Sequence, residues 1–377
     1  MHEVTKSFRG VGLVAVFLMT GLYVLAPFNR WFELVSLVAL ISGIWALAHH
    51  QIRPVIFGIP GFWVFSGLFL AFWIPAALSL PDSPKWDLGL RSLFGHLRFW
   101  ILGIVVVWLY PRCHRTFMLV MAGVLIFWAF DAFYEVLMGK DWLGRPRHGN
   151  RVNGPFDVPK LGYFTALLFL PLIVWAGQRS TPLAGLLLLI ATGTVLVSAD
   201  RGGWVHWFWA LSIPSALCLL MWPRKSLRYV WLAPAFALVT LILYLSHAPI
   251  KQRFDHSLAA ILGGVESFKD KEARGYLFET AGNMFSEHPV NGIGFRGFRY
   301  AYNDYVPEGQ EVRQGSDPST GKATGHAHAH SVFLTFVSEM GLFGVVGYFL
   351  LLGAGFVGVF LCIQQKMWVS TAWWSSY

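Results

Sequence analysis

The strongest candidates for chemistry in this sequence are histidines at alternating positions. They lie in Gly325-His-Ala-His-Ala-His330-Ser331, so an extended backbone would place His326, His328 and His330 on one face. Imidazole binds zinc, copper or nickel, which makes a metal site one interpretation. No cysteine or carboxylate lies at local ligand spacing, so a general base is the favoured alternative, because imidazole titrates near physiological pH. His330 is the best placed, because it directly precedes a predicted apolar helix over 331–340.

Two arginines are candidates for binding an anionic group. Asp200-Arg201-Gly202-Gly203 interrupts an apolar stretch that runs from Leu183 to Trp222 with only a tight turn. A charge at such depth is costly, which makes Arg201 a functional candidate, and the two glycines would let a ligand approach the backbone closely. The alternative is an Asp–Arg pair that caps two helices. Arg274 begins a predicted amphipathic helix over 274–285, and its alternative interpretation is a solvated surface charge.

Further charged residues lie near the predicted membrane surface. Arg91 and Arg98 share one side of a helix where a span begins, and both could also extend to lipid headgroups. Asp131 and Glu135 share a face near the end of another span, where they would pair with these arginines or reach the interface. Glu339 precedes Gly341 at the end of the predicted short helix. There it would orient a histidine or arginine, or act as a carboxylate favoured by the dipole of the next span.

The composition places these residues in a membrane protein. The chain has 377 residues, of which 55% are hydrophobic and 13% are charged. A soluble domain averages about 45–50% and about 25% respectively. The basic residues lie in short loops between apolar runs rather than in a cluster, so the net charge of +9 is a topology signal and not a nucleic-acid footprint. The sequence therefore predicts an all-α polytopic membrane protein.

The apolar runs predict the membrane spans and their orientation. A membrane-spanning helix takes about 20 apolar residues. Such runs occur at 11–28, 31–48, 54–80, 94–110, 115–137, 161–177, 182–198, 203–222, 228–246 and 342–363. With the N-terminus in the cytoplasm, the inner loops hold basic residues and no acidic residue, and Glu3 is the one acid on that side. This distribution agrees with the positive-inside rule.

Three regions follow from these spans. Residues 1–246 would form transmembrane helices 1 to 9 with short loops, and 247–330 a large, partly helical periplasmic loop. Residues 331–377 would form a short re-entrant helix, a glycine turn and the final span. The total expected is about ten to twelve spans.

Four segments in this order resemble the O-antigen ligase and polymerase superfamily, and the O-antigen ligase family within it. They are Arg151-Val-Asn-Gly-Pro-Phe-Asp-Val-Pro159; Ser198-Ala-Asp-Arg201-Gly-Gly; Arg274 with His288-Pro-Val-Asn-Gly-Ile-Gly294-Phe-Arg-Gly-Phe298; and His330-Ser-Val-Phe-Leu334 with Glu339-Met-Gly341-Leu-Phe-Gly344. The resemblance covers residues 150–350 and implies a fold similar to the integral-membrane (GT-C) class of lipid-carrier glycosyltransferases.

The resemblance also implies an activity. Such proteins transfer a glycan from an undecaprenyl-pyrophosphate carrier at the periplasmic face of the bacterial inner membrane. Ligases use lipid A–core as the acceptor, in lipopolysaccharide biosynthesis, whereas polymerases use another carrier-linked glycan. The family's essential arginines match Arg201 and Arg274, and its essential histidine matches His330. The partners expected are therefore this donor, this acceptor and membrane lipids, with no nucleic acid.

The residue chemistry agrees with that activity. Arginine forks stabilise a leaving pyrophosphate, and the outer loops hold no Asp-x-Asp pair for magnesium, so neither metal nor cofactor is expected. His330 would be the general base, and attack opposite the leaving group predicts inversion. Weaker candidates for substrate binding are Arg91, Arg98, Arg151 and Glu339.

Two other functions stay open at this point. An O-antigen polymerase shares the motifs and differs in its acceptor. A membrane transporter with a His-rich metal-binding loop would explain His326 and His328, which have no role in the resemblance.

Overall fold

The computed structural model describes most of the chain. The described residues are 21, 24–25, 27, 29–147, 151–158, 160–221, 238, 241–242, 244–245, 248–262, 274–317 and 320–364. The predicted spans 11–28 and 228–246 lie mostly outside these residues, as does 365–377.

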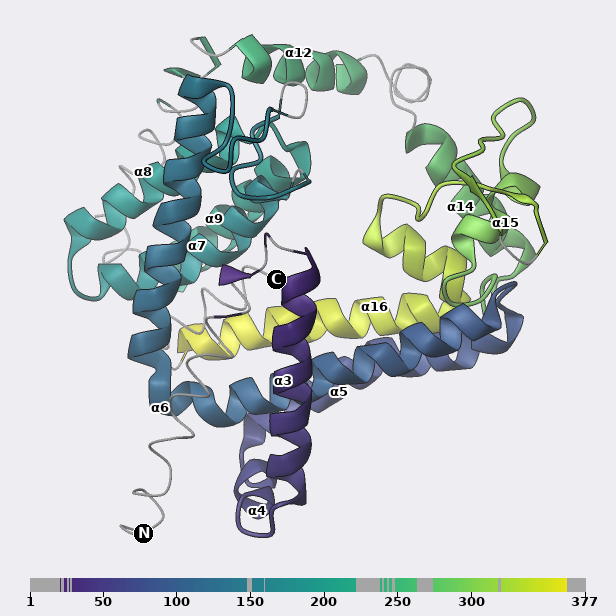
Figure 1. The fold of residues 1–377 in the computed structure, drawn as a ribbon, viewed down its shortest axis with the longest axis horizontal. Coiled ribbons are helices and arrows are strands. Elements are labelled where there is room, and N and C mark those ends of the chain that lie inside the picture. Colours follow the sequence, from purple (N-terminus) through teal and green to yellow (C-terminus); the bar gives the residue numbers. More distant parts are fainter. Residues whose placement is uncertain are drawn as a thin grey trace. The chain divides into compact units, whose positions relative to one another are not determined.

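Helices dominate the described residues (Figure 1). They are α3 (Asn29–Ala48), α4 (Arg53–Phe57), α5 (Pro60–Ser79), the 3-10 helix η1 (Leu80–Asp82), α6 (Trp86–Met138), α7 (Leu161–Gly177), α8 (Thr181–Val197), α9 (Arg201–Met221), α12 (Ala248–Leu262), α14 (Arg274–Glu287), α15 (Phe298–Tyr305) and α16 (Val332–Gln364). The strands β1 (Gly315–Ser316) and β2 (Ala323–Thr324) pair antiparallel, with Gly315 opposite Thr324.

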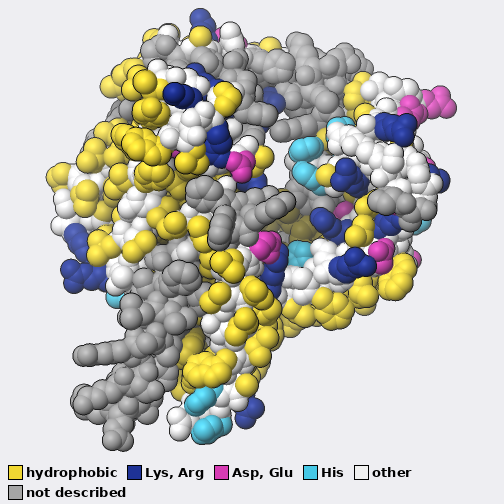
Figure 2. Space-filling model, viewed as in Figure 1, with side chains coloured by type: hydrophobic (Ala, Val, Ile, Leu, Met, Phe, Trp, Pro, Cys, Tyr) yellow, Lys and Arg dark blue, Asp and Glu magenta, His cyan; other side chains and the backbone are white. Residues whose placement is uncertain are grey.

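Several helices are suited to a bilayer. Among the described residues, four stretches are long and apolar enough to cross a membrane: Pro60–Asp82, Trp86–Trp108, His114–Met138 and Val332–Gly358. Shorter apolar helices cover Glu33–Ala48, Leu161–Gly177 and Thr181–Val197. Large apolar side chains such as Trp63, Phe94 and Leu186 are exposed on these helices, and Figure 2 shows broad hydrophobic surfaces. Such surfaces suit lipid tails, and the all-α polytopic membrane fold is confirmed.

Two predicted element boundaries are wrong. The run 54–80 is not one helix, because α4 ends at Phe57 and α5 begins at Pro60, and proline favours the first turn of a new helix. The loop expected between 94–110 and 115–137 is helical, so α6 is one run of 53 residues. Pro111 is the one helix breaker at that junction, and proline kinks a helix without having to end it.

The chain divides into two compact units. Among described elements, the first unit contains α7, α8, α9 and the part of α6 after residue 109. The second contains α4, α5, the beginning of α6, α14, α15, the strands and α16 up to residue 354. Each unit is described by itself below.

In the first unit, α7 packs against both α8 and α9. Ser180 caps α8 by accepting a hydrogen bond from the backbone N–H of Leu183 at 3.4 Å. The indole N–H of Trp207 on α9 donates to the Thr192 hydroxyl of α8 at 3.2 Å, and both side chains are buried. This hydrogen bond satisfies two polar groups inside the apolar layer, as burial requires.

A glycine contact sets the approach of α7 and α9. A Cβ added to Gly203 would lie 2.7 Å from the carbonyl carbon of Gly162, which leaves no room for a side chain. At the neighbouring Gly202 it would meet only Asp200 Oδ1, at 3.5 Å. The expectation that Gly203 admits a ligand is therefore wrong, because the α7 backbone fills that space.

We expect Gly203→Ala to lower the free energy of unfolding by about 1–3 kcal/mol, because the new methyl group overpacks the α7–α9 contact. Gly202→Ala is the matched control and should change it by no more than about 0.5 kcal/mol, because its Cβ meets an ordinary contact. Thermal unfolding of both variants in detergent measures the difference. Equal melting temperatures would contradict the contact.

Candidate functional site

Three of the sequence motifs share a backbone feature. Among the described residues, the non-glycine residues with positive φ are Ala199 (51°), Arg296 (65°) and His330 (53°). Each lies in a different motif. Ala199 lies two residues before Arg201, Arg296 lies in the segment that follows α14, and His330 lies just before α16. Left-handed backbone at a residue with a Cβ costs about 1–3 kcal/mol and concentrates at functional sites. The strain therefore marks the same segments that the sequence singles out.

His330 is held at the start of α16. Ser331 caps the helix, since its hydroxyl accepts a hydrogen bond from the N–H of Leu334 at 3.4 Å. The carbonyl of Ser331 accepts from the N–H of Thr335 at 2.9 Å. His330 therefore has a backbone fixed by a capped helix, while its side chain is exposed. An exposed imidazole on a fixed backbone can meet a substrate hydroxyl.

The three histidines do not share one face. The rings of His328 and His330 lie 4.4 Å apart between centroids, and both side chains are exposed. His326 is half-buried, with its ring 5.2 Å from that of Tyr302 and its Nδ1 2.8 Å from Nε2 of Gln314. Burial, with a smaller contribution from His328, lowers the pKa of His326. No group of three potential metal ligands occurs among the described residues.

The segment that follows α14 and the Glu339–Gly344 segment of α16 interlock in the second unit. Gly341 interrupts α16 with φ 58° and ψ −142°. A Cβ on Gly341 would lie 2.5 Å from the Val290 carbonyl oxygen, and one on Gly292 would lie 2.5 Å from the Glu339 carbonyl carbon. Two backbone hydrogen bonds flank this contact: Leu342 N–H to Pro289 O at 2.8 Å and Ile293 N–H to Ser338 O at 2.9 Å.

Glu339 completes this contact with its side chain. It is 5% exposed, and its carboxylate accepts hydrogen bonds from the N–H groups of Arg296 at 3.0 Å and Phe298 at 3.3 Å. The sequence placed Glu339 beneath a histidine or arginine side chain, whereas the structure pairs it with backbone amides. Its observed contacts therefore position a loop, because a carboxylate is the strongest acceptor available for such amides.

The polar segment between α14 and α16 has its own core. Leu277, Met284, Phe298, Tyr302 and Ala329 are buried together. Phe295 instead packs into a second cluster with Ala76, Leu93, Phe336 and Met340. Phe295 thus packs the segment against α5, α6 and α16, and Figure 2 shows basic and histidine side chains gathered where Figure 1 places α14 and α15.

The predicted arginines of the second unit are on helices. Arg274 begins α14, as the sequence predicted. Arg91 is exposed on α6, and Arg98 is half-buried with its guanidinium 4.8 Å from the ring centroid of Phe99.

In the first unit, Arg201 is the first residue of α9 and is half-buried. The Asp200 carboxylate accepts from the N–H of Gly202 at 3.2 Å, so Asp200 caps this helix. The capping interpretation of the Asp–Arg turn therefore holds for Asp200.

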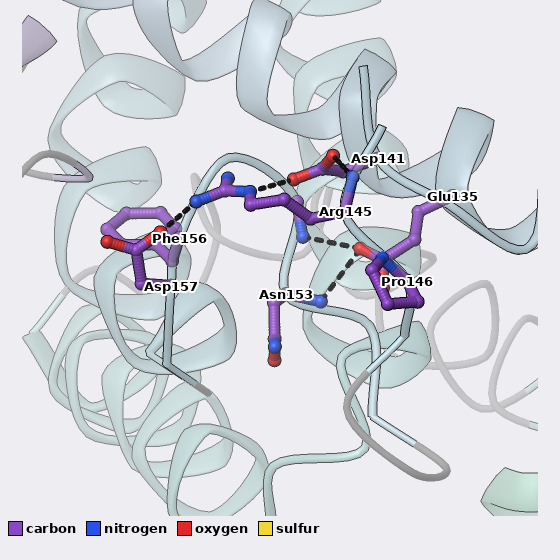
Figure 3. A pocket seen from close by; sticks show the side chains of 8 residues that line it. Glu135, Asp141, Arg145, Pro146, Asn153, Phe156 and Asp157 are labelled. Atoms are coloured by element: carbon purple, nitrogen blue, oxygen red, sulfur yellow. Dashed lines mark hydrogen bonds and ion pairs between the residues drawn. The ribbon is translucent and has the colours of Figure 1, made fainter. Parts of the chain in front are cut away.

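Glu135, near the end of α6, anchors the segment with Arg151 (Figure 3). Glu135 accepts from the N–H groups of Asn153 at 2.9 Å and Gly154 at 2.7 Å. Asp131 accepts from the N–H of Trp142 at 2.6 Å. These carboxylates thus hold the backbone of the following loop, an arrangement that sequence reasoning missed. Arg151 itself is half-buried at the start of the anchored segment.

A small polar pocket lies beside these contacts (Figure 3). Arg145 binds Asp141 through Nε at 2.6 Å and also pairs with Asp157. Arg145 Nη2 and Asn153 Oδ1 are buried and have no hydrogen-bond partner in the described part of the chain. Water or another small polar group would satisfy such atoms.

The candidates divide between the units. The first unit holds Arg151 and Arg201; the second holds Arg91, Arg98, Arg274, His330 and Glu339. Within the second unit, the structure brings the His288–Phe298 segment and the Glu339–Gly341 break into contact. Sequence reasoning missed the strained backbone of Arg296, which leaves no signal in one sequence. It also missed the helix cap at Ser331, although a serine before an apolar run is a recognised capping signal.

Helices that can cross a bilayer, joined by a polar segment with its own core, define a multi-pass membrane protein. Residues 164–349 match the family described as O-antigen ligase, and the chain belongs to this family. The match includes Arg201, Arg274, His330 and Glu339. Membership supports a function of the ligase or polymerase type. The protein is therefore a glycosyl-transferring enzyme that acts on lipid-linked glycans. No curated protein matches the chain.

We expect Glu339→Ala to lower the free energy of unfolding by about 2–4 kcal/mol, because it leaves two backbone amides without a carboxylate acceptor. Glu339→Gln keeps one acceptor oxygen and should lose about half as much. Thermal unfolding in detergent, with Glu287→Ala on the exposed end of α14 as the control, measures both changes. An unchanged melting temperature for Glu339→Ala would contradict the positioning role.

Proposed function

We propose that this protein is an inverting O-antigen ligase. It transfers O-antigen glycan from undecaprenyl pyrophosphate to lipid A–core at the periplasmic face of the bacterial inner membrane, in lipopolysaccharide biosynthesis. Family membership supports the type of reaction. His330 is assigned as the base because of one observation: its imidazole is exposed on a strained backbone directly before a capped helix.

His330 acts as the general base in this proposal. Its neutral imidazole takes the proton from the acceptor hydroxyl as the oxygen attacks the anomeric carbon of the donor sugar. The bond from that carbon to the pyrophosphate oxygen breaks, and the electron pair leaves with the carrier pyrophosphate. Attack from the opposite side inverts the anomeric configuration. A positioned imidazole suits this task, since such bases contribute about 10²–10⁴-fold to rate.

Arg201 and Arg274 stabilise the leaving pyrophosphate in this proposal. Each begins a helix, α9 and α14 respectively, and a helix N-terminus adds backbone N–H groups that favour an anion. Arginine stays charged and binds phosphate oxygens in a fork, so it neutralises charge as the bond breaks. Arg91, Arg98 and Arg151 are proposed helpers. The proposal needs no metal or cofactor for these steps.

The topology is part of the proposal. The chain crosses the membrane about ten to twelve times, with a cytoplasmic N-terminus and the segment 247–330 in the periplasm. The donor enters from the bilayer, since its carrier is a lipid. A polymerase would use the same groups and a carrier-linked glycan as acceptor, so the acceptor decides between the two activities.

We expect His330→Ala to reduce glycan transfer by at least about 10²-fold, because the acceptor hydroxyl loses its base. Purified protein is given undecaprenyl-pyrophosphate glycan and lipid A–core, with and without EDTA. Transfer by the wild type should be insensitive to EDTA. His288→Ala is the matched control, because His288 is an exposed histidine of the same segment whose ring contacts Tyr305.

Each outcome decides a different point. Full activity of a folded His330→Ala variant would remove His330 as the base. Chain extension on carrier-linked glycan, without transfer to lipid A–core, would make the protein a polymerase. Loss of transfer with EDTA, restored by a divalent ion, would overturn the metal-independent step.

A further inference from the structure

His328 is a second imidazole beside the proposed base. Its ring centroid lies 4.4 Å from that of His330, with 55° between the ring planes. Both side chains are exposed, so no apolar neighbour separates them from solvent. The proposed function gives His328 no role, and the resemblance to the family gives it none.

The pair is built by the chain between the two residues. Ala329 is 0% exposed and belongs to the buried cluster that contains Leu277 and Tyr302. Ala329 points into this cluster, whereas the side chains of His328 and His330 on either side of it are exposed. The φ of 53° at His330 and the cap at Ser331 then fix the second ring of the pair. The proximity of the rings is thus a property of the backbone.

His326 does not belong to this pair. Its Nδ1 lies 2.8 Å from Nε2 of Gln314, and its ring packs on Tyr302 at 5.2 Å. Tyr302 is a titratable neighbour of His326, and burial is the main cause of the lowered pKa of His326. The alternating string therefore divides into one histidine tied to the segment's core and two on its surface.

A base at this position needs a partner for the proton that it gains. His330 lies at the N-terminus of α16, where the helix dipole disfavours a positive charge. An imidazole works as a base when its second nitrogen is held by a hydrogen bond, which also selects the tautomer. A neutral imidazole beside it can accept that hydrogen bond, and rotation of rings this close brings their nitrogens within reach.

We propose that His328 is a positioning residue for His330, which accepts a hydrogen bond from the second nitrogen of the base and stabilises its protonated form. This inference rests on the proposed function. In the step, the acceptor O–H bond breaks and an N–H bond forms on one nitrogen of His330. The N–H on the other nitrogen is donated to neutral His328. Because both rings are exposed, the proton then leaves to water, and His330 is neutral for the next cycle.

We expect His328→Ala to lower kcat about tenfold and to leave KM unchanged, since the contact matters once the proton has moved. The acid limb of the kcat–pH profile should move to lower pH, because His330 loses the hydrogen-bond acceptor that this proposal assigns to His328. His328→Gln supplies a carbonyl acceptor that does not titrate, so it should restore part of kcat. His326→Ala is the matched control and should leave the profile in place.

A second measurement does not depend on transfer activity. Diethyl pyrocarbonate modifies neutral imidazole, so peptide mapping at a series of pH values gives the pH at which half of His330 reacts. This midpoint should fall in His328→Ala and stay constant in His326→Ala. An unchanged midpoint in His328→Ala, or wild-type kcat with an unchanged acid limb, would overturn the proposal. A shifted midpoint in a protein that transfers no glycan would support the pair and refute the proposed function.

Discussion

The Glu339 carboxylate is the contact on which the outer part of the second unit depends. It lies where Gly341 breaks α16, and it binds the backbone of the segment that connects α14 to α15. Without it, two buried amides would lack an acceptor, and the close approach of Gly292 to Gly341 would lose its neighbouring support. The same helical segment begins at Val332, after the Ser331 cap that directly follows His330. One buried carboxylate therefore fixes both the loop and the far end of the helix that follows the proposed base.

Runs of apolar residues between polar turns predicted several helices well. The bounds expected at 161–177 match α7, and the start expected at Arg274 matches α14. Both could be predicted because the pattern of apolar residues and the flanking turn are local properties of the sequence. The non-helical backbone at Gly341 lies where a glycine separates two apolar runs. The prediction was wrong at 111–114, because one proline and one arginine did not outweigh the helix preference on both sides.

Contacts between distant residues could not be predicted in this way. Gly203 looked open to a ligand, yet the α7 backbone lies against it, and nothing local to the motif reveals that partner. The alternating histidines suggested one shared face, but burial of Ala329 and the contact of His326 with Gln314 divided them. Strain at Ala199, Arg296 and His330 is likewise a consequence of tertiary packing. The residue types of the candidate site were thus accessible from sequence, and its geometry was not.

The anchoring of the α6 carboxylates has a consequence for synthesis of the chain. Glu135 lies in a stretch that can cross the membrane, yet its backbone partners come 18 and 19 residues later. As this helix leaves the ribosome, those amides do not yet exist, and a carboxylate within a spanning helix is unfavourable without partners. The partners that satisfy Glu135 in the folded protein therefore exist only after residues 153 and 154 have been synthesised.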